Sequence, residues 1–109
     1  MQVNYTKVDM DGFETAFGQA KQEHKTIIII FKGTTDQATG ENWCSDCVKA
    51  ESAIKEVLLP ECLKQGLPVI ECSVGDRAAW MNKSHPLRMH PVLKVTGVPT
   101  IVYFNNNHA

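Results

Sequence analysis

The sequence lacks both a long apolar run and an excess of charge of either sign. Its longest uninterrupted apolar stretch is Ile27–Phe31, far shorter than the roughly 20 residues that a membrane-spanning helix needs. Eleven Lys and Arg oppose 12 Asp and Glu, and the formal net charge is −1. Because no overall field attracts nucleic acid or an anionic membrane, we expect neither among its partners.

The N-terminal residues also lack the basic and then apolar pattern of a secretory signal. If Met1 is the natural start, the protein therefore stays in the cytoplasm. Structural disulfides are rare in that reducing compartment. The four cysteines then point to redox chemistry or to metal binding, and their spacing has to decide between the two.

With 109 residues, of which 43% are apolar and 21% charged, the chain has the size and composition of one ordinary globular domain. We expect a single domain over residues 1–109, without internal repeats.

Segments with the pattern of a strand and segments with the pattern of a helix follow one another along the chain. This order predicts an α/β fold with helices packed on a central mixed sheet. The β-branched run Thr26–Phe31 has no polar interruption, which is typical of a central strand covered on both faces. Apolar residues recur at helical spacing after Asp11, an expected N-cap. We expect strands at 5–10, 26–31, 67–74 and 100–104, helices at 11–24 and from about 45 to Pro60, a loop at 33–42, a short helix and a turn within 76–89, and a turn at 105–107.

Two cysteines separated by two residues, Cys44 and Cys47, follow Trp43 at the expected start of the second helix. Unpaired N–H groups and the helix dipole favour a thiolate there, so the pKa of Cys44 should fall. Two intervening residues place the second sulfur about one helical turn away, within reach of a disulfide. We predict that Cys44 is the attacking nucleophile and that Cys47 is the resolving thiol.

A pair with this spacing can also form half of a zinc site. A four-ligand zinc ribbon normally supplies a second closely spaced pair. The other cysteines, Cys62 and Cys72, are instead nine residues apart and fall on an expected helix end and an expected strand. We therefore predict no metal site, and we expect Cys62 and Cys72 to be small buried side chains.

Pro99 stands just before the strand expected at 100–104. A trans proline at the first residue of a strand is the ordinary alternative. A cis Val98–Pro99 bond beside the cysteines would instead expose backbone groups that pair with an extended substrate. Because the cysteine pair lies upstream, we favour the cis bond and predict that Val98 and Pro99 bind substrate.

Three neighbours of the cysteines each allow two interpretations. We favour Trp43 as an apolar platform for substrate over a buried core residue. Asp46 either modulates the Cys44 thiolate or caps the helix. Glu51, four residues after Cys47, could act as a base, but a solvated helix residue is the simpler interpretation.

The succession of a strand, WCxxC at a helix start and VPT before another strand resembles the thioredoxin superfamily. Within it, the long loop before Trp43, the segment Val69–Asp76, the following Trp80 and the segment Leu93–Thr100 are similar to the thioredoxin domain-containing protein 17 family of cytosolic thioredoxin-related proteins. The resemblance covers nearly the whole chain. It implies a thioredoxin-like fold, of which the usual last strand and helix would be missing, as in a chain truncated at its C-terminus.

The resemblance also implies a protein-disulfide reductase that binds no cofactor and receives electrons from NADPH through thioredoxin reductase. Its substrates would be disulfide-containing proteins or cystine, and a dynein light chain is a candidate partner. Two departures matter. Ser45 stands where the family usually has proline, so Ser45 and Asp46 could modulate the redox potential, and the strand Ile27–Phe31 lacks the buried aspartate of ordinary thioredoxin.

A second hypothesis is a redox-sensing adaptor that holds partners without turnover. It rests on the expected loop at 33–42, which beside the cysteines could restrict access and select partners.

Overall fold

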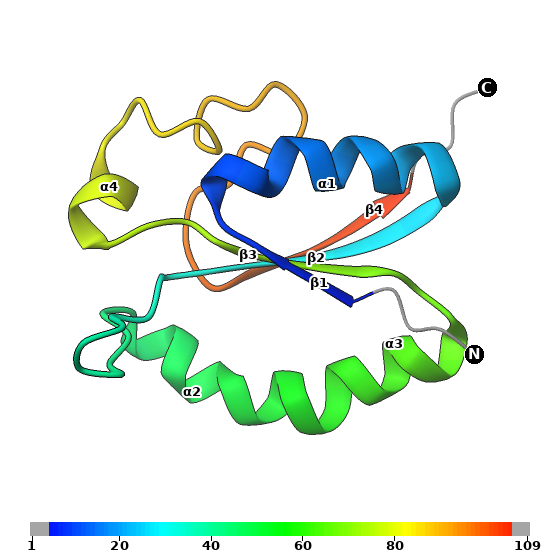
Figure 1. Cartoon of the computed structure of the whole chain (residues 1–109), viewed down its shortest axis with the longest axis horizontal. Helices are drawn as coiled ribbons and strands as arrows, with labels where there is room; N and C mark the ends of the chain where they lie inside the picture. Colours follow the sequence, from blue (N-terminus) through cyan, green and yellow to red (C-terminus); the bar gives the residue numbers. More distant parts are fainter. Residues whose placement is uncertain (1–4, 106–109) are drawn as a thin grey trace.

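The computed structural model of the chain describes residues 5–105 and shows an α/β architecture (Figure 1). In chain order, its elements are β1 (Tyr5–Val8), α1 (Met10–Glu23), β2 (Thr26–Lys32), α2 (Ser45–Ala53), the π-helical turn η1 (Ile54–Leu58), α3 (Leu59–Gln65), β3 (Val69–Ser73), α4 (Arg77–Met81) and β4 (Thr100–Asn105).

The four strands form one mixed sheet in the order β1-β3-β2-β4. Strands β1, β3 and β2 are parallel, whereas β4 pairs antiparallel with β2. Helix α1 lies on one face of the sheet, and α2, η1 and α3 run as one rod along the other face (Figure 1). The predicted mixed sheet with flanking helices is therefore confirmed.

Strand β2 is buried on both faces, as its uninterrupted apolar sequence predicts. Ile27, Ile29 and Phe31 belong to a core cluster that also holds the phenylalanines of α1. Ile28 and Ile30 point the other way, into a second cluster with residues of η1 and α3. Because side chains alternate along a strand, one apolar run supplies both halves of the core.

The structure corrects two expected helix bounds, the start of the first helix and the end of the second helical segment. The N-cap of α1 is Asp9, not Asp11, because the Asp9 carboxylate accepts hydrogen bonds from the N–H groups of Asp11 and Gly12. The second helical segment also does not end at Pro60. Proline has no N–H to donate, and the chain passes through the wider π turn η1 just before it and continues to Gln65.

The short helix expected within 76–89 is α4, which Asp76 caps. The turn expected at 105–107 lies outside the described residues except for Asn105, the last residue of β4. Among residues 5–105, every helix is too short or too polar to cross a membrane.

Candidate active site around the cysteine pair

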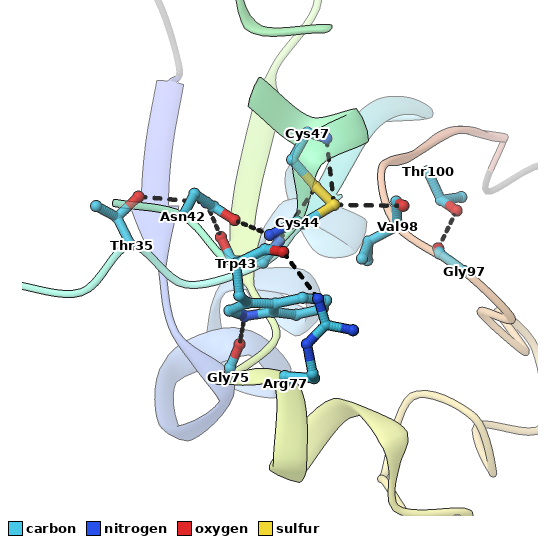
Figure 2. The surroundings of a disulfide bond; sticks show 11 residues. Thr35, Asn42, Trp43, Cys44, Cys47, Gly75, Arg77, Gly97, Val98 and Thr100 are labelled. Atoms are coloured by element: carbon cyan, nitrogen blue, oxygen red, sulfur yellow. Dashed lines mark hydrogen bonds between the residues drawn. A yellow bond between two sulfur atoms is a disulfide. The ribbon is translucent and has the colours of Figure 1, made fainter. Parts of the chain in front are cut away.

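Cys44 and Cys47 form a disulfide at the N-terminus of α2 (Figure 2). Their Cα atoms are 5.2 Å apart, within the usual span of a disulfide. Cys44 is itself the N-cap, and its sulfur accepts a hydrogen bond from the Cys47 N–H at 3.2 Å. A helix N-terminus stabilises negative charge, so this position favours a thiolate on Cys44 once the disulfide is reduced.

The two sulfurs face different surroundings although both residues are shielded, with 6% of Cys44 and 5% of Cys47 exposed. Cys44 lines an open groove of about 450 Å³. Cys47 lines a much smaller cavity on the inner side, and its sulfur accepts a hydrogen bond from the Gly33 N–H at 3.4 Å. An external reactant therefore reaches Cys44 through the groove.

The Val98–Pro99 peptide bond is cis, as expected from the sequence. The Cys44 sulfur lies 3.6 Å from the Val98 carbonyl oxygen, as Figure 2 shows. The Thr100 hydroxyl donates a hydrogen bond to the Gly97 carbonyl just beside this bond. Val98 thus forms a wall of the Cys44 groove, and Pro99 lies on the Cys47 side in the inner cavity.

Asn42 joins the loop to the cysteine pair. Its side-chain N–H group donates to the Gly33 carbonyl at 2.6 Å and to the Thr35 hydroxyl at 3.3 Å. Its side-chain oxygen accepts from the Cys44 N–H at 2.9 Å. One amide therefore connects the end of β2, the loop and the N-cap of α2 (Figure 2).

Trp43 is half-buried and packs against the core cluster on the α1 side of the sheet. Its indole N–H donates to the Gly75 carbonyl at 2.9 Å. Its carbonyl oxygen accepts from Arg77 at 3.3 Å (Figure 2). Trp43 also lines the Cys44 groove, so the same residue contacts both the core and the groove.

A charged pair of the buried Glu71 and the partly exposed Lys32 lies behind Cys47. The Lys32 ammonium is 2.7 Å from the Glu71 carboxylate, which also accepts a hydrogen bond from the Tyr5 hydroxyl. Burial acts to raise the pKa of Glu71, but the hydrogen bonds from Lys32 and Tyr5 and the charges of Lys32 and Lys7 outweigh it and lower the pKa. Glu71 and Lys32 line the same inner cavity as Cys47.

The other residues singled out from the sequence lie at or near the surface of α2. Ser45 and Asp46 are exposed and line the Cys44 groove. The capping role considered for Asp46 is wrong, because the sulfur of Cys44 makes the N-cap hydrogen bond. Glu51 is an exposed helix residue that pairs with Lys55 at 2.8 Å, and this contact lowers its pKa.

Cys62 and Cys72 are free and buried, as expected. They lie in different core clusters, on opposite faces of the sheet. Among residues 5–105, no group of three or more His, Cys, Asp or Glu is arranged to hold a metal ion.

Sequence reasoning missed three residues of this site. Asn42 and Gly33 were placed only in a loop of unspecified conformation, and Glu71 received no role. A usable signal existed for Glu71, since an acidic residue between Ile70 and Cys72 in an otherwise apolar strand requires a partner when buried.

Comparison with known proteins agrees with this geometry. Residues 6–109 match the family model described as thioredoxin domain-containing protein 17-like, thioredoxin domain. The chain is 38% identical to human thioredoxin domain-containing protein 17 over 102 residues, which cover 92% of this chain and 78% of the human protein. It is 37% identical to the thioredoxin-like protein Clot of Arabidopsis thaliana over 83 residues, or 76% of this chain and 60% of Clot.

The family match spans nearly the whole chain, and the site holds a cysteine pair at a helix N-terminus beside a cis proline. These features fit a thiol oxidoreductase. The chain therefore belongs to the thioredoxin domain-containing protein 17-like family and has its thioredoxin-like fold.

Proposed function

We propose that this protein is a protein-disulfide reductase in which Cys44 and Cys47 form the reacting dithiol. The observation that carries the proposal is the unequal access to the two sulfurs: Cys44 lines the open groove and Cys47 the small inner cavity. The proposed substrates are selected protein disulfides and cystine.

In the first step, the Cys44 thiolate attacks one sulfur of a substrate disulfide. A mixed disulfide forms, and the other substrate sulfur leaves as a thiolate. Docking of an extended substrate along Val98 and the cis Pro99, with Trp43 as its platform, would present the scissile bond to Cys44. The position of the Val98 carbonyl 3.6 Å from the Cys44 sulfur supports this placement.

In the second step, Cys47 attacks the Cys44 sulfur, the protein disulfide forms and the second substrate thiol leaves. Cys47 must lose a proton for this attack. Glu71 is the proposed proton acceptor because it lines the cavity that holds Cys47. That cavity is about 10 Å³, close to the smallest space that holds one water.

The cycle closes when a reductase returns two electrons to the disulfide. We propose thioredoxin reductase and NADPH as the source, in the cytoplasm, without a cofactor bound to this chain. Family membership supports this assignment, and a dynein light chain stays a candidate partner on the same grounds.

The test is NADPH consumption by thioredoxin reductase in the presence of this protein and either insulin or cystine. We expect consumption with the wild-type protein and none above background with Cys44→Ser. A Cys47→Ser variant should accumulate the mixed disulfide, detected by mass spectrometry. Equal consumption by wild type and Cys44→Ser would overturn the proposal.

A redox-sensing adaptor is the second candidate function. A groove of about 500 Å³ between the loop and the start of α4, lined by Thr35, Glu41 and Asp76 among others, favours it because a partner could dock there beside Trp43. A Cys44→Ser, Cys47→Ser double variant that captures the same partner with unchanged affinity would favour the adaptor over turnover.

A further inference from the structure

Two arginines, Arg77 and Arg88, line the same groove as Cys44. They come from different segments: Arg77 begins α4, and Arg88 lies in the chain between α4 and β4. Neither arginine belongs to a motif of the sequence, and the proposed reduction chemistry does not use them.

Each guanidinium is held in place by a tryptophan. The Arg88 Nε donates to the Trp80 carbonyl at 2.8 Å, and the guanidinium carbon lies 4.2 Å from the centroid of the Trp80 ring. Arg77 donates to the Trp43 carbonyl at 3.3 Å (Figure 2), and its guanidinium carbon lies 5.5 Å from the centroid of the Trp43 ring. Hydrogen bonds and cation–π contacts thus orient both groups before any ligand arrives.

Within the described part of the chain, neither guanidinium has an acidic partner. Over residues 5–105, no carboxylate forms an ion pair with Arg77 or Arg88. Each group uses one N–H in the contacts above and keeps further donors in the fork geometry that matches a carboxylate. The groove contains one acid, Asp46, against these two cations.

We infer that this groove selects disulfides that carry a carboxylate beside the reacting cysteine, above all extended protein segments with an adjacent Asp or Glu. The inference rests on the proposed reductase function and names its substrate class. A carboxylate in the groove would accept hydrogen bonds from the remaining N–H groups of Arg77 and Arg88. Cys44, which lines the same groove, would attack the disulfide. Acidic flanks would then bind more tightly than neutral ones, and basic flanks would be repelled.

The test uses blocked disulfide peptides that differ only in the residue beside the cysteine, which is Glu, Gln or Lys. A fourth peptide carries Gln and a free C-terminal carboxylate, so that a side-chain carboxylate and a terminal one are distinguished. Pre-reduced full-length protein is mixed with each peptide, and the second-order rate constant for oxidation of its dithiol is measured. We expect rates in the order Glu, Gln, Lys, with about three- to tenfold between steps, and near equality in 1 M salt.

Arg77→Gln and Arg88→Gln should each reduce the Glu-to-Gln rate ratio, and the double variant should bring it close to one. Arg77 is exposed, so its variant retains the fold even if Arg88→Gln does not. Lys64→Gln, on the exposed surface of α3, removes the same charge far from the groove and should leave the ratio unchanged. Equal rates for Glu and Lys peptides with the wild-type protein, or a ratio that survives in the double variant, would overturn the inference.

Binding separates this inference from the proposed function. Fluorescent peptides with Ser in place of Cys are titrated with the oxidised protein, and anisotropy gives their affinities. A preference for Glu over Lys without reduction of any peptide would keep the acidic-substrate groove and refute the reductase. Reduction of all peptides at equal rates, with equal affinities, would support the reductase and refute the preference of the groove for acidic substrates.

Discussion

Gly33 and Trp43 approach so closely that no side chain fits between them. A Cβ built on Gly33 would lie 2.8 Å from the indole ring and 2.9 Å from the side-chain oxygen of Asn42. The same glycine donates its N–H to the Cys47 sulfur. We therefore predict that Gly33→Ala displaces Trp43 or Asn42 and destabilises the protein by about 1–3 kcal/mol, measured by urea unfolding.

Gly18 provides the matched control for this substitution. It lies inside α1, and a Cβ there would meet nothing within 4 Å. Gly18→Ala should stabilise the protein by about 0.5–1 kcal/mol, because alanine loses less backbone entropy in a helix. If both variants shifted stability in the same direction, the steric explanation for Gly33 would be wrong.

The Glu71–Lys32 pair makes stability depend on pH. The pKa of Glu71 is lowered in the folded protein, so the pair stabilises the fold above the unfolded carboxyl pKa of about 4.3 and loses this effect as pH falls through the folded value. Glu71→Gln leaves the partly exposed Lys32 charge without its partner and should cost about 1–3 kcal/mol at pH 7. Urea unfolding should show that this cost shrinks below pH 4.

The control is the double variant Glu71→Leu, Lys32→Met, which removes both charges. Because apolar replacements of a buried pair are often neutral or stabilising, it should recover most of the stability lost by Glu71→Gln. A stability difference between wild type and Glu71→Gln that is the same at pH 7 and pH 3.5 would contradict the role assigned to the ionised carboxylate.

Cysteine reactivity should separate the reacting pair from the structural thiols. Burial, with the charge of Asp9 adding to it, raises the pKa of Cys72 to about 12, so Cys72 is a protonated thiol at pH 8 and a poor nucleophile. Burial also raises the pKa of Cys62. In the reduced native protein, iodoacetamide at pH 8 should therefore modify Cys44 well before Cys62 or Cys72. Mass spectrometry of timed samples checks the order, and early labelling of Cys72 would contradict it.

The sequence predicted those parts of the fold that depend on local pattern. The apolar run of β2 was sufficient because burying a polar side chain costs free energy unless it finds a partner, so a strand covered on both faces is mostly apolar. The start of α2 near Cys44 followed from the residues there, and the cis bond at Pro99 followed from its place after the cysteine pair and before a strand. The start of α1 was misplaced because Asp9 and Asp11 are both good caps, and only the backbone shows which one precedes the first turn.

The missed parts of the site depend on contacts between distant segments. Glu71 and Lys32 meet because β3 and β2 pair with Ile30 opposite Glu71, a register that neither strand encodes by itself. Arg77 and Arg88 are held by backbone carbonyls of tryptophans, and carbonyl positions leave no trace in a residue pattern. Asn42 was missed for the same reason, because two of its three contacts are with the backbone groups of Gly33 and Cys44.

Asp46 allows a prediction of opposite sign to the arginine variants. It is exposed in the first turn of α2 and lines the groove with Arg77 and Arg88, so its charge repels the carboxylate that they attract. Asp46→Asn should increase the Glu-to-Gln rate ratio by about two- to threefold, and the increase should vanish in 1 M salt. Glu56→Gln, an exposed acid of η1 outside the groove, is the charge-matched control. A ratio that rises equally in both variants would mean that net charge, rather than the groove, sets the preference.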